Sequence, residues 1–263
     1  MLDTHQKLKE LYKSWGTPLD VDEFISTISE KLESSGFRAD NSRLAFSVCP
    51  DDLNRLDSRK TIERALVKQY DGEFHLGSLG AYPIAGKTGI VAASHHAPAI
   101  IEQDGSAEGN LIIFASAHVG FQPDDGGLFG KVKRPGQEKI TTCCGAMMGF
   151  LRRLKESKST SIFNSNIENR IDIAREVFFS ELASNFTPEL TRLLSIKEEN
   201  RQVIELSKIN YALISLKLKE IVTSFVNEND FEGQIALIGG ITVNLTEEDH
   251  FIWKEFEVLK GKK

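Results

Sequence analysis

The spacing of hydrophobic and polar positions changes along the chain and predicts both helices and strands. Apolar side chains recur every three or four positions in the first forty residues and again from 167 to about 227, which is typical of amphipathic helices. Predominantly apolar runs at 44–49, 111–117 and 233–244, the last with a Gly-Gly interruption, are typical of buried strands. The helical stripes are Leu8, Leu11 and Trp15; Phe24, Ile28 and Leu32; Ile167, Ile171, Phe178 and Leu182; and Ile204, Ile214, Leu218 and Ile221.

These elements predict an α/β fold with a mostly parallel central sheet flanked by helices, because buried strands alternate with helical segments. Extra helices are expected at the N-terminus and in the C-terminal third. The chain of 263 residues is long enough for one large or two small domains. Strands far apart in the sequence favour one domain over 1–263, with a helical cover at 1–40, a core at 41–160, and a helical segment with a returning strand at 161–263.

Composition and charge exclude two classes of partner. The net charge of −6 disfavours nucleic acid, whose binding depends on clustered Lys and Arg. No apolar run is long enough to span a bilayer, and the first residues are mixed in charge rather than typical of a signal sequence. With only 3 Cys, disulfides are not expected, and we predict a cytoplasmic protein without a membrane partner.

The three cysteines and one histidine suggest a metal site. Cys49 and His118 are each predicted at the end of a buried strand, and Cys144 lies near the start of a predicted helix. Zinc accepts thiolate and imidazole ligands, and two Cys with one His leave a fourth position open for water. The spacing is not that of a compact zinc motif. The alternative is that the cysteines pack as small apolar groups while the histidine satisfies a local backbone group.

Cys143 and Cys144 are adjacent, so their side chains point in different directions and one of them is expected to face a metal. We predict Cys144 as the ligand and Cys143 as a buried neighbour. The expected helix places both near backbone N–H groups that favour a thiolate.

Asp51 and Arg55 are predicted to form a pair at i and i+4 on a helix that starts after Pro50. An acid held by an arginine beside a metal stays ionised, leaves the open position to water and can accept a hydrogen bond from the nucleophile. The alternative is a solvated ion pair that contributes less than about 1 kcal/mol.

Two other enzyme classes fit the sequence less well. The GKT at 86–88 suggests a P-loop, but that motif needs a glycine at position 81, which is Ala81. A zinc hydrolase or deaminase could use the same ligands, yet the deaminase signature H-x-E with P-C-x-x-C does not occur.

Several segments together resemble the limiting-CO2-inducible protein B/C family, whose fold is similar to that of beta-type carbonic anhydrases and whose active members are called theta-type. The resemblance covers most of the chain and is weakest between 167 and 226. The matching segments are CPDD at 49–52, FHLGSLGAYPIAGKTG at 74–89, SHHAP at 94–98, HVGF at 118–121, RPGQ at 134–137, CCGA at 143–146 and ALIGGITVN at 236–244.

The resemblance implies a beta-carbonic-anhydrase-like fold and zinc bound by Cys49, His118 and Cys144, with Asp51 as the acid beside the metal. Arg55 is a departure, because beta-type enzymes place this arginine two residues after the acid, where this chain has a leucine. The long loop between the histidine and the cysteine also departs from beta-type enzymes and agrees better with the algal family.

The implied activity is carbonic anhydrase (EC 4.2.1.1), the reversible hydration of carbon dioxide to bicarbonate. Tyr82, Lys87, His95 and His96 are further candidates for a substrate pocket or a proton shuttle, while a purely structural role is the alternative for the histidines. Some family members lack activity, so the other function considered is a catalytically silent, zinc-containing binding or assembly protein that responds to bicarbonate. By analogy with beta-type relatives we expect a homodimer.

Overall fold

The computed structural model describes residues 4–70, 72–98, 109–124, 127–163, 171–229 and 231–261. The helices are α1 (Thr4–Tyr12), α2 (Val21–Ser34), α3 (Ile62–Gln69), α4 (Gly86–His95), α5 (Gly145–Ser157), α6 (Ile173–Asn185), α7 (Thr187–Ser195) and α8 (Glu199–Glu228). Short 3-10 turns are η1 (Asp52–Asn54), η2 (Leu79–Ala81) and η3 (Thr160–Phe163). The strands are β1 (Thr17–Asp20), β2 (Ser42–Val48), β3 (Glu73–His75), β4 (Asn110–Gln122), β5 (Leu128–Phe129), β6 (Lys131–Lys133), β7 (Ile140–Thr142), β8 (Gln234–Asn244) and β9 (Asp249–Lys260).

The central sheet has the strand order β1-β9-β8-β4-β2-β3, and β5 pairs with the end of β4. The four strands β8, β4, β2 and β3 are parallel to one another. The prediction of a mixed α/β fold with a mostly parallel sheet is therefore confirmed. The strands β9 and β1 add an antiparallel edge that the sequence pattern does not predict.

The register of the central strands brings their carboxyl ends to one edge of the sheet. Val48, the last residue of β2, pairs with Ser116 of β4, which is level with Gly240 of β8. The strand β4 continues beyond β2, and His118 pairs with Thr242 of β8. Residues that follow β2 consequently lie beside the second half of β4.

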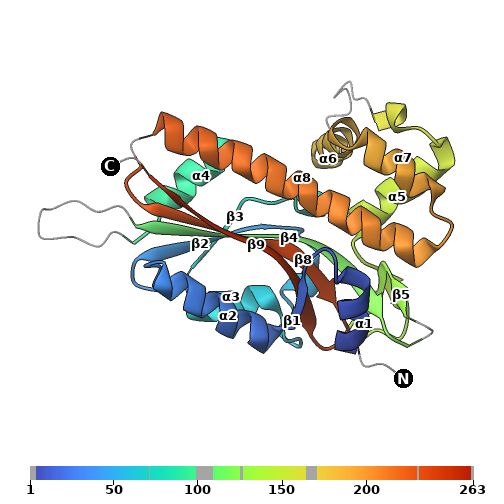
Figure 1. Cartoon of the computed structure of the whole chain (residues 1–263), viewed down its shortest axis with the longest axis horizontal. Helices are drawn as coiled ribbons and strands as arrows, with labels where there is room; N and C mark the ends of the chain where they lie inside the picture. The colour runs from blue at the N-terminus through green and yellow to red at the C-terminus, as the bar shows by residue number, and fades with distance from the viewer. Residues whose placement is uncertain are drawn as a thin grey trace, which may run out of the picture.

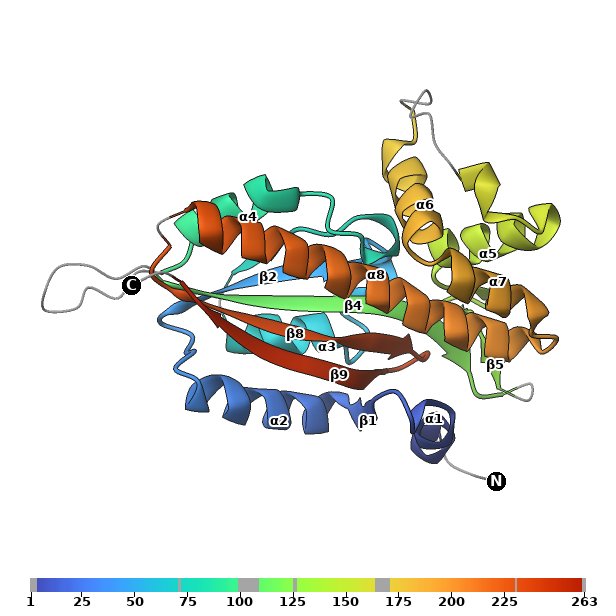
Figure 2. The ribbon, with the colours of Figure 1, turned by 45° about the horizontal axis from the view of Figure 1, so that its top comes forward.

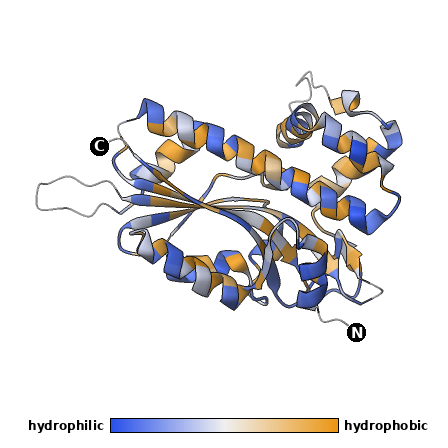
Figure 3. Ribbon diagram, viewed as in Figure 1, coloured by the Kyte–Doolittle hydropathy of each residue, from blue (hydrophilic) through white to orange (hydrophobic). Residues whose placement is uncertain are grey.

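Two layers of helices cover the sheet (Figure 1). Helices α2 and α3 pack on one face, while α4 and the long α8 cross the other, and α5, α6 and α7 gather at one end of α8 (Figure 2). Apolar residues run through the sheet and along α8 (Figure 3). Along β4, Ile112 and Phe114 belong to the core under α2, whereas Leu111 and Ile113 belong to the core under α8. This alternation is that of a strand buried on both faces.

The structure corrects several local predictions. The segment after Pro50 forms only the 3-10 turn η1 rather than an α-helix. The short strand β1 separates the two N-terminal helices, and the strand expected at 111–117 extends to Gln122. Ile171, expected in a buried stripe, is 97% exposed, and Ile167 lies outside the described residues. Among the helices that the structure describes, none is both long enough and apolar enough to cross a bilayer.

Gly239 is expected to be intolerant of a side chain. A Cβ there would overlap the hydroxyl of Tyr211, which reaches from α8 to Glu255 of β9. Gly149 of α5 is the matched control, because nothing lies within 4 Å of a Cβ at that position. We expect Gly239→Ala to lower the free energy of unfolding by about 1–3 kcal/mol, and Gly149→Ala to raise it by about 0.5–1 kcal/mol. Urea denaturation measures both, and equal effects would contradict the close packing of α8 on β8.

Candidate metal centre

Cys49 directly follows β2, so the end of that strand sets its position. The chain after β3 runs beside it, because the N–H groups of Leu76 and Gly77 both donate to the carbonyl of Phe46, at 2.8 and 3.2 Å. A Cβ at Gly77 would lie 2.5 Å from the carbonyl oxygen of Val48, so glycine permits this close approach. The Cys49 side chain is consequently buried, with 4% of the residue exposed.

His118 lies on β4, two residues beyond the last pairing with β2. The residue is 1% exposed. Its Nδ1 lies 2.8 Å from Oδ1 of Asn244 on the neighbouring strand β8. Its Nε2 is also buried and has no hydrogen-bond partner among the described residues. An unpaired buried nitrogen is costly unless a ligand satisfies it.

The small sheet of β6 and β7 returns the chain to the edge of β4 and delivers the cysteine pair. The Gly120 N–H donates to the carbonyl of Cys143 at 3.1 Å, and the Cys143 N–H donates to the carbonyl of Gly130 at 2.9 Å. A side chain at position 120 would collide with Cys143, whose Cβ would lie 2.9 Å from the new Cβ. Cys144 then occupies the N-cap position of α5, without a side-chain hydrogen bond to the helix. Three remote segments thus meet beside His118.

The predicted ligands Cys49, His118 and Cys144 lie together, with one ligand atom of each within 4.8 Å of the others. The sulfurs of Cys49 and Cys144 are 3.7 Å apart. Two thiolates on one tetrahedral zinc ion, at about 2.3 Å each, are separated by about 3.8 Å. Together with the unpaired Nε2 of His118, this spacing fits a metal ion held by two sulfurs and one nitrogen. A second group, Asp51, His118 and Cys143, meets the same distance limit.

The surroundings raise the pKa of two of the predicted ligands, Cys49 and His118. The hydrogen bond with Cys144 and burial both raise the pKa of the Cys49 thiol. Burial lowers the pKa of His118, but the neighbouring sulfurs of Cys143 and Cys49 outweigh it and hold that pKa well above its usual value. A metal that binds as thiolate and neutral imidazole ligands must displace these protons, so affinity is expected to fall as the pH is lowered.

Asp51 is held by Arg134, which lies between β6 and β7. The two terminal nitrogens of Arg134 donate to the two carboxylate oxygens of Asp51 at 3.0 and 3.2 Å. The N–H of Leu53 donates to the same carboxylate at 3.2 Å. Burial raises the pKa of Asp51, but the hydrogen bonds from Arg134, the charge of His118 and the Leu53 N–H together outweigh it, so the net pKa lies below its usual value. Asp51 is therefore ionised at neutral pH.

The prediction that Arg55 pairs with Asp51 is wrong. Arg55 ends the turn η1 with a non-helical backbone conformation, so the i to i+4 geometry of an α-helix is not available. Its guanidinium instead contacts Glu63 at 3.2 Å and Nδ1 of His75 at 3.3 Å.

Three of the four pocket or shuttle candidates lie on or beside α4, away from the cysteines. Lys87 forms an ion pair with Glu228 near the end of α8. The His96 ring packs against Phe74 of β3. Through the pairing of both strands with β2, Phe74 lies level with Ile113 of β4. That level is five residues before His118, or about 17 Å along the strand.

His95, next to His96, is exposed, so the structure does not bring this pair to the candidate site. Tyr82 is half-buried, and this burial is the main cause that raises the pKa of its hydroxyl. The nearby charge of Glu181 raises the pKa further, while Lys217 opposes the shift. Tyr82 therefore faces charged residues of α6 and α8.

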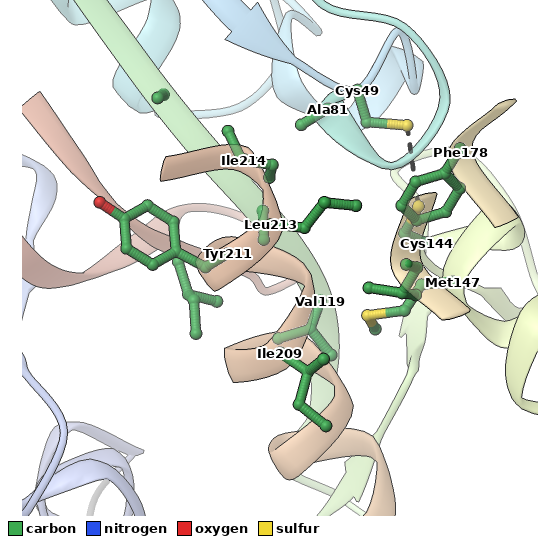
Figure 4. Packing of buried hydrophobic residues seen from close by; sticks show 14 of the residues in the cluster. Cys49, Ala81, Val119, Cys144, Met147, Phe178, Ile209, Tyr211, Leu213 and Ile214 are labelled. Carbon is green, nitrogen blue, oxygen red and sulfur yellow. Dashed lines mark hydrogen bonds between the residues drawn. The ribbon is translucent and has the colours of Figure 1, made fainter. Parts of the chain in front are cut away.

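Apolar side chains enclose the sulfur pair. Figure 4 shows Cys49 beside Ala81, and Phe178 and Met147 near Cys144. A Cβ at Gly80 would lie in the Phe178 ring, so this aromatic side chain is packed directly against η2. Ala81 has a left-handed backbone with φ of 65°, a conformation that costs energy for a residue with a side chain. Packing therefore fixes the loop that covers Cys49.

The comparisons identify the family. The family model of the limiting CO2-inducible proteins B/C beta carbonic anhydrases matches residues 18–260. The chain belongs to this family. No curated protein sequence matches it.

Solved structures of the family share the fold. The crystal structure of PtLCIB4, a homolog of the limiting CO2-inducible protein LCIB, is 24% identical over 96% of this chain and 95% of its own, with a TM-score of 0.75. A point mutant of PtLCIB4 is 24% identical over 98% and 94%, with a TM-score of 0.77. LCIB itself is 15% identical over 97% and 95%, with a TM-score of 0.70. At these identities the likeness concerns the fold.

Two residues of the site are not singled out by the sequence pattern. Arg134 begins the RPGQ segment, and Asn244 ends the ALIGGITVN segment, both of which carry the family resemblance. Cys143 is buried as expected, but it contacts Nδ1 of His118 at 3.5 Å and Oδ1 of Asn244 at 3.4 Å. The family segments are therefore a signal for Arg134 and Asn244, although spacing alone gives neither residue a role.

Loss of Arg134 is expected to raise the pKa of Asp51. In Arg134→Gln the guanidinium no longer opposes the burial of Asp51, so the pKa of Asp51 should rise relative to the wild-type protein. Arg55→Gln is the matched control and should leave it unchanged. Carbon-13 NMR of the Asp51 carboxyl group measures both. Because the pKa is lower in the folded chain, the pair stabilises the protein above about pH 4 and loses that effect in acid. A shift in Arg55→Gln alone would contradict the assignment.

Proposed function

We propose that this protein is a zinc-dependent carbonic anhydrase that reversibly hydrates carbon dioxide to bicarbonate. The observation that carries the proposal is the convergence of Cys49, His118 and Cys144, with a sulfur separation of 3.7 Å that fits tetrahedral zinc. The family supports it, since its description is that of beta carbonic anhydrases. When bound, zinc supplies a hydroxide nucleophile at neutral pH by lowering the pKa of water towards about 7.

Asp51 is suited to orient the attacking oxygen. Its carboxylate receives three hydrogen bonds, two from Arg134 and one from Leu53. A carboxylate offers about four lone-pair positions, so one is left to accept a hydrogen bond from the nucleophile. A carboxylate oxygen of Asp51 also lies within 4.8 Å of a ring nitrogen of His118. Arg134 keeps the acid ionised and fixes its orientation.

The burial of the site favours a small, uncharged substrate. Cys49 and Cys144 are at most 4% exposed, and Ala81, Met147 and Phe178 surround them (Figure 4). A charged or bulky substrate would lose its hydration without gaining partners on these apolar side chains. Carbon dioxide is small and uncharged, so it can enter such surroundings at little cost.

Cys144→Ser is expected to weaken zinc binding by more than about 100-fold, because a ligand is lost. Cys143→Ser is the matched control, since it changes the adjacent residue in the same way and should retain zinc. Chelator competition at equilibrium gives the affinities, and elemental analysis gives the stoichiometry. Zinc loss in Cys143→Ser with retention in Cys144→Ser would reverse the assignment of the ligand.

Asp51→Asn is expected to keep zinc and to lower the rate of carbon dioxide hydration by about 100-fold or more. The amide has no charge to pair with Arg134, and it has one acceptor oxygen where the carboxylate has two. Stopped-flow measurement with a pH indicator on zinc-loaded protein gives the rate. A zinc-loaded wild-type protein with no rate above buffer would overturn the enzyme proposal and favour the silent, bicarbonate-responsive binding protein.

We also propose a homodimer, which rests on the analogy with beta-type relatives alone. Light scattering coupled to size exclusion measures the mass of the assembly directly, and a single species of 29.3 kDa would rule the dimer out.

A further inference from the structure

Asn244 is the centre of a buried hydrogen-bond network that reaches away from the candidate metal site. Its Oδ1 lies 2.8 Å from Nδ1 of His118 and 3.4 Å from Sγ of Cys143. Its Nδ2 donates to Oδ1 of Asp249 at 2.9 Å and to Oδ1 of Asn54 at 3.2 Å. All of these residues are buried. The oxygen and the nitrogen of this amide therefore both have hydrogen-bond partners, and the partners of the nitrogen are carbonyl or carboxylate oxygens.

Asp249 fixes which way the Asn244 amide faces. Its oxygens contact Nη2 of Arg59 at 2.8 Å, Nδ2 of Asn244 at 2.9 Å and the N–H of Ile62 at 3.2 Å. Burial raises the pKa of Asp249, but Arg59 and the N–H of Ile62 can only donate, so neither offers an acceptor for a proton on the carboxyl group. A reversed amide would place its oxygen against the carboxylate of Asp249. The oxygen of Asn244 must then face His118.

Arg59 anchors the far end of the chain of contacts. Its side chain is fully buried in an ion pair with Asp249. It also donates to the carbonyls of Leu245 at 2.6 Å and Leu53. The Leu53 contact joins this anchor to the turn η1, which follows Cys49. Removing one partner of a buried ion pair is strongly destabilising, so the anchor holds Asp249 in one position.

We propose that the chain Arg59–Asp249–Asn244 fixes His118 as the tautomer with hydrogen on Nδ1 and thereby presents the lone pair of Nε2 to the metal beside Cys49 and Cys144. The oxygen of Asn244 can only accept, so Nδ1 must donate. The neutral ring then carries its lone pair on Nε2, the atom without a partner among the described residues. Asn244 is a positioning residue, and this role rests on the proposed function of the site.

Asn54 connects the same hydrogen-bond network to the backbone of Cys49. Its Nδ2 donates to the backbone carbonyl of Cys49 at 3.0 Å, while its Oδ1 accepts a hydrogen bond from Nδ2 of Asn244. One amide therefore connects the ring of His118 to the backbone that carries Cys49. Hydrogen bonds of this kind around metal ligands typically contribute 10–100-fold in metal affinity.

A neighbouring pair on the same strands supplies the control. Ser116 of β4 and Thr242 of β8 share a hydrogen bond of 2.7 Å, and they lie two residues before His118 and Asn244 on the same strands. Thr242→Val removes a buried polar group from β8 without touching the His118 contact. If the loss of any buried polar group from β8 were enough to weaken zinc binding, Thr242→Val would weaken it as the loss of the Asn244 amide does.

The first experiment measures the tautomer in protein labelled with 15N-histidine. Long-range 1H–15N spectra show which ring nitrogen carries hydrogen, and His118→Gln assigns the signal among the 6 His. In the zinc-loaded protein we expect hydrogen on Nδ1 and zinc on Nε2. The metal-free protein at alkaline pH should show the same neutral tautomer. A neutral His118 ring with hydrogen on Nε2 instead of Nδ1 in the wild-type protein would overturn the proposal.

The second experiment measures zinc affinity by chelator competition. Asn244→Leu should weaken binding by about 10–100-fold, whereas Thr242→Val should stay within about threefold of wild type. Asn244→Asp retains an acceptor for Nδ1, so its folded fraction should keep the tautomer and bind zinc more tightly than Asn244→Leu. A folded Asn244→Leu with wild-type tautomer and affinity would overturn the proposal. If Asn244→Leu does not fold, the wild-type and Asn244→Asp spectra decide it.

These readouts separate this inference from the proposed function. A protein that binds zinc without hydrating carbon dioxide would refute the enzyme, while the tautomer and the affinities would still test Asn244. A wild-type protein that binds no zinc would refute the metal site, and the metal-free spectrum alone would then decide the tautomer.

Discussion

The parallel pairing of β4 with β2 and β8 is the constraint on which the rest of the structure depends. It places the end of β2 level with Ser116, and it places His118 two residues further, paired with Thr242 of β8 and within hydrogen-bond distance of the Asn244 side chain. A slip by one residue in β4 would turn His118 towards the opposite face of the sheet. The long apolar runs of these strands, packed on both faces, prevent that slip because every position on each face is filled. The geometry of the candidate site is thus a consequence of core packing.

The parts of this arrangement that follow from local pattern could be predicted from the sequence. Short apolar runs identify the central strands, and the rule that parallel strands end at one edge brings Cys49 and His118 together. The antiparallel strands β1 and β9 do not follow from such a pattern. The strand β1 has only four residues, and its pairing depends on β9, more than two hundred positions away. A segment of this length is too short to show the alternation of apolar and polar residues that identifies a strand.

The partners of the site residues show why spacing alone is insufficient. The rule that residues at i and i+4 meet holds only inside an α-helix, and the turn η1 ends before Arg55 can satisfy it. Arg134 reaches Asp51 because β6 and β7 fold back along the edge of β4. Its position depends on several long-range contacts, including the approach of Cys143 to Gly120. Only the family segments point to that part of the chain.

Burying so many polar groups beside an apolar core is unfavourable unless each group has a partner. Asn244, Asp249 and Arg59 satisfy one another and the surrounding backbone, and Arg134 satisfies Asp51. Within the described residues the network leaves Nε2 of His118 unpaired, at the point where two sulfurs approach to 3.7 Å. An unpaired buried group amid an otherwise satisfied network is costly, and a bound ion would remove that cost. The free energy of metal binding is therefore coupled to the stability of the fold, and the same contacts that hold the strands in register prepare the site for its ligand.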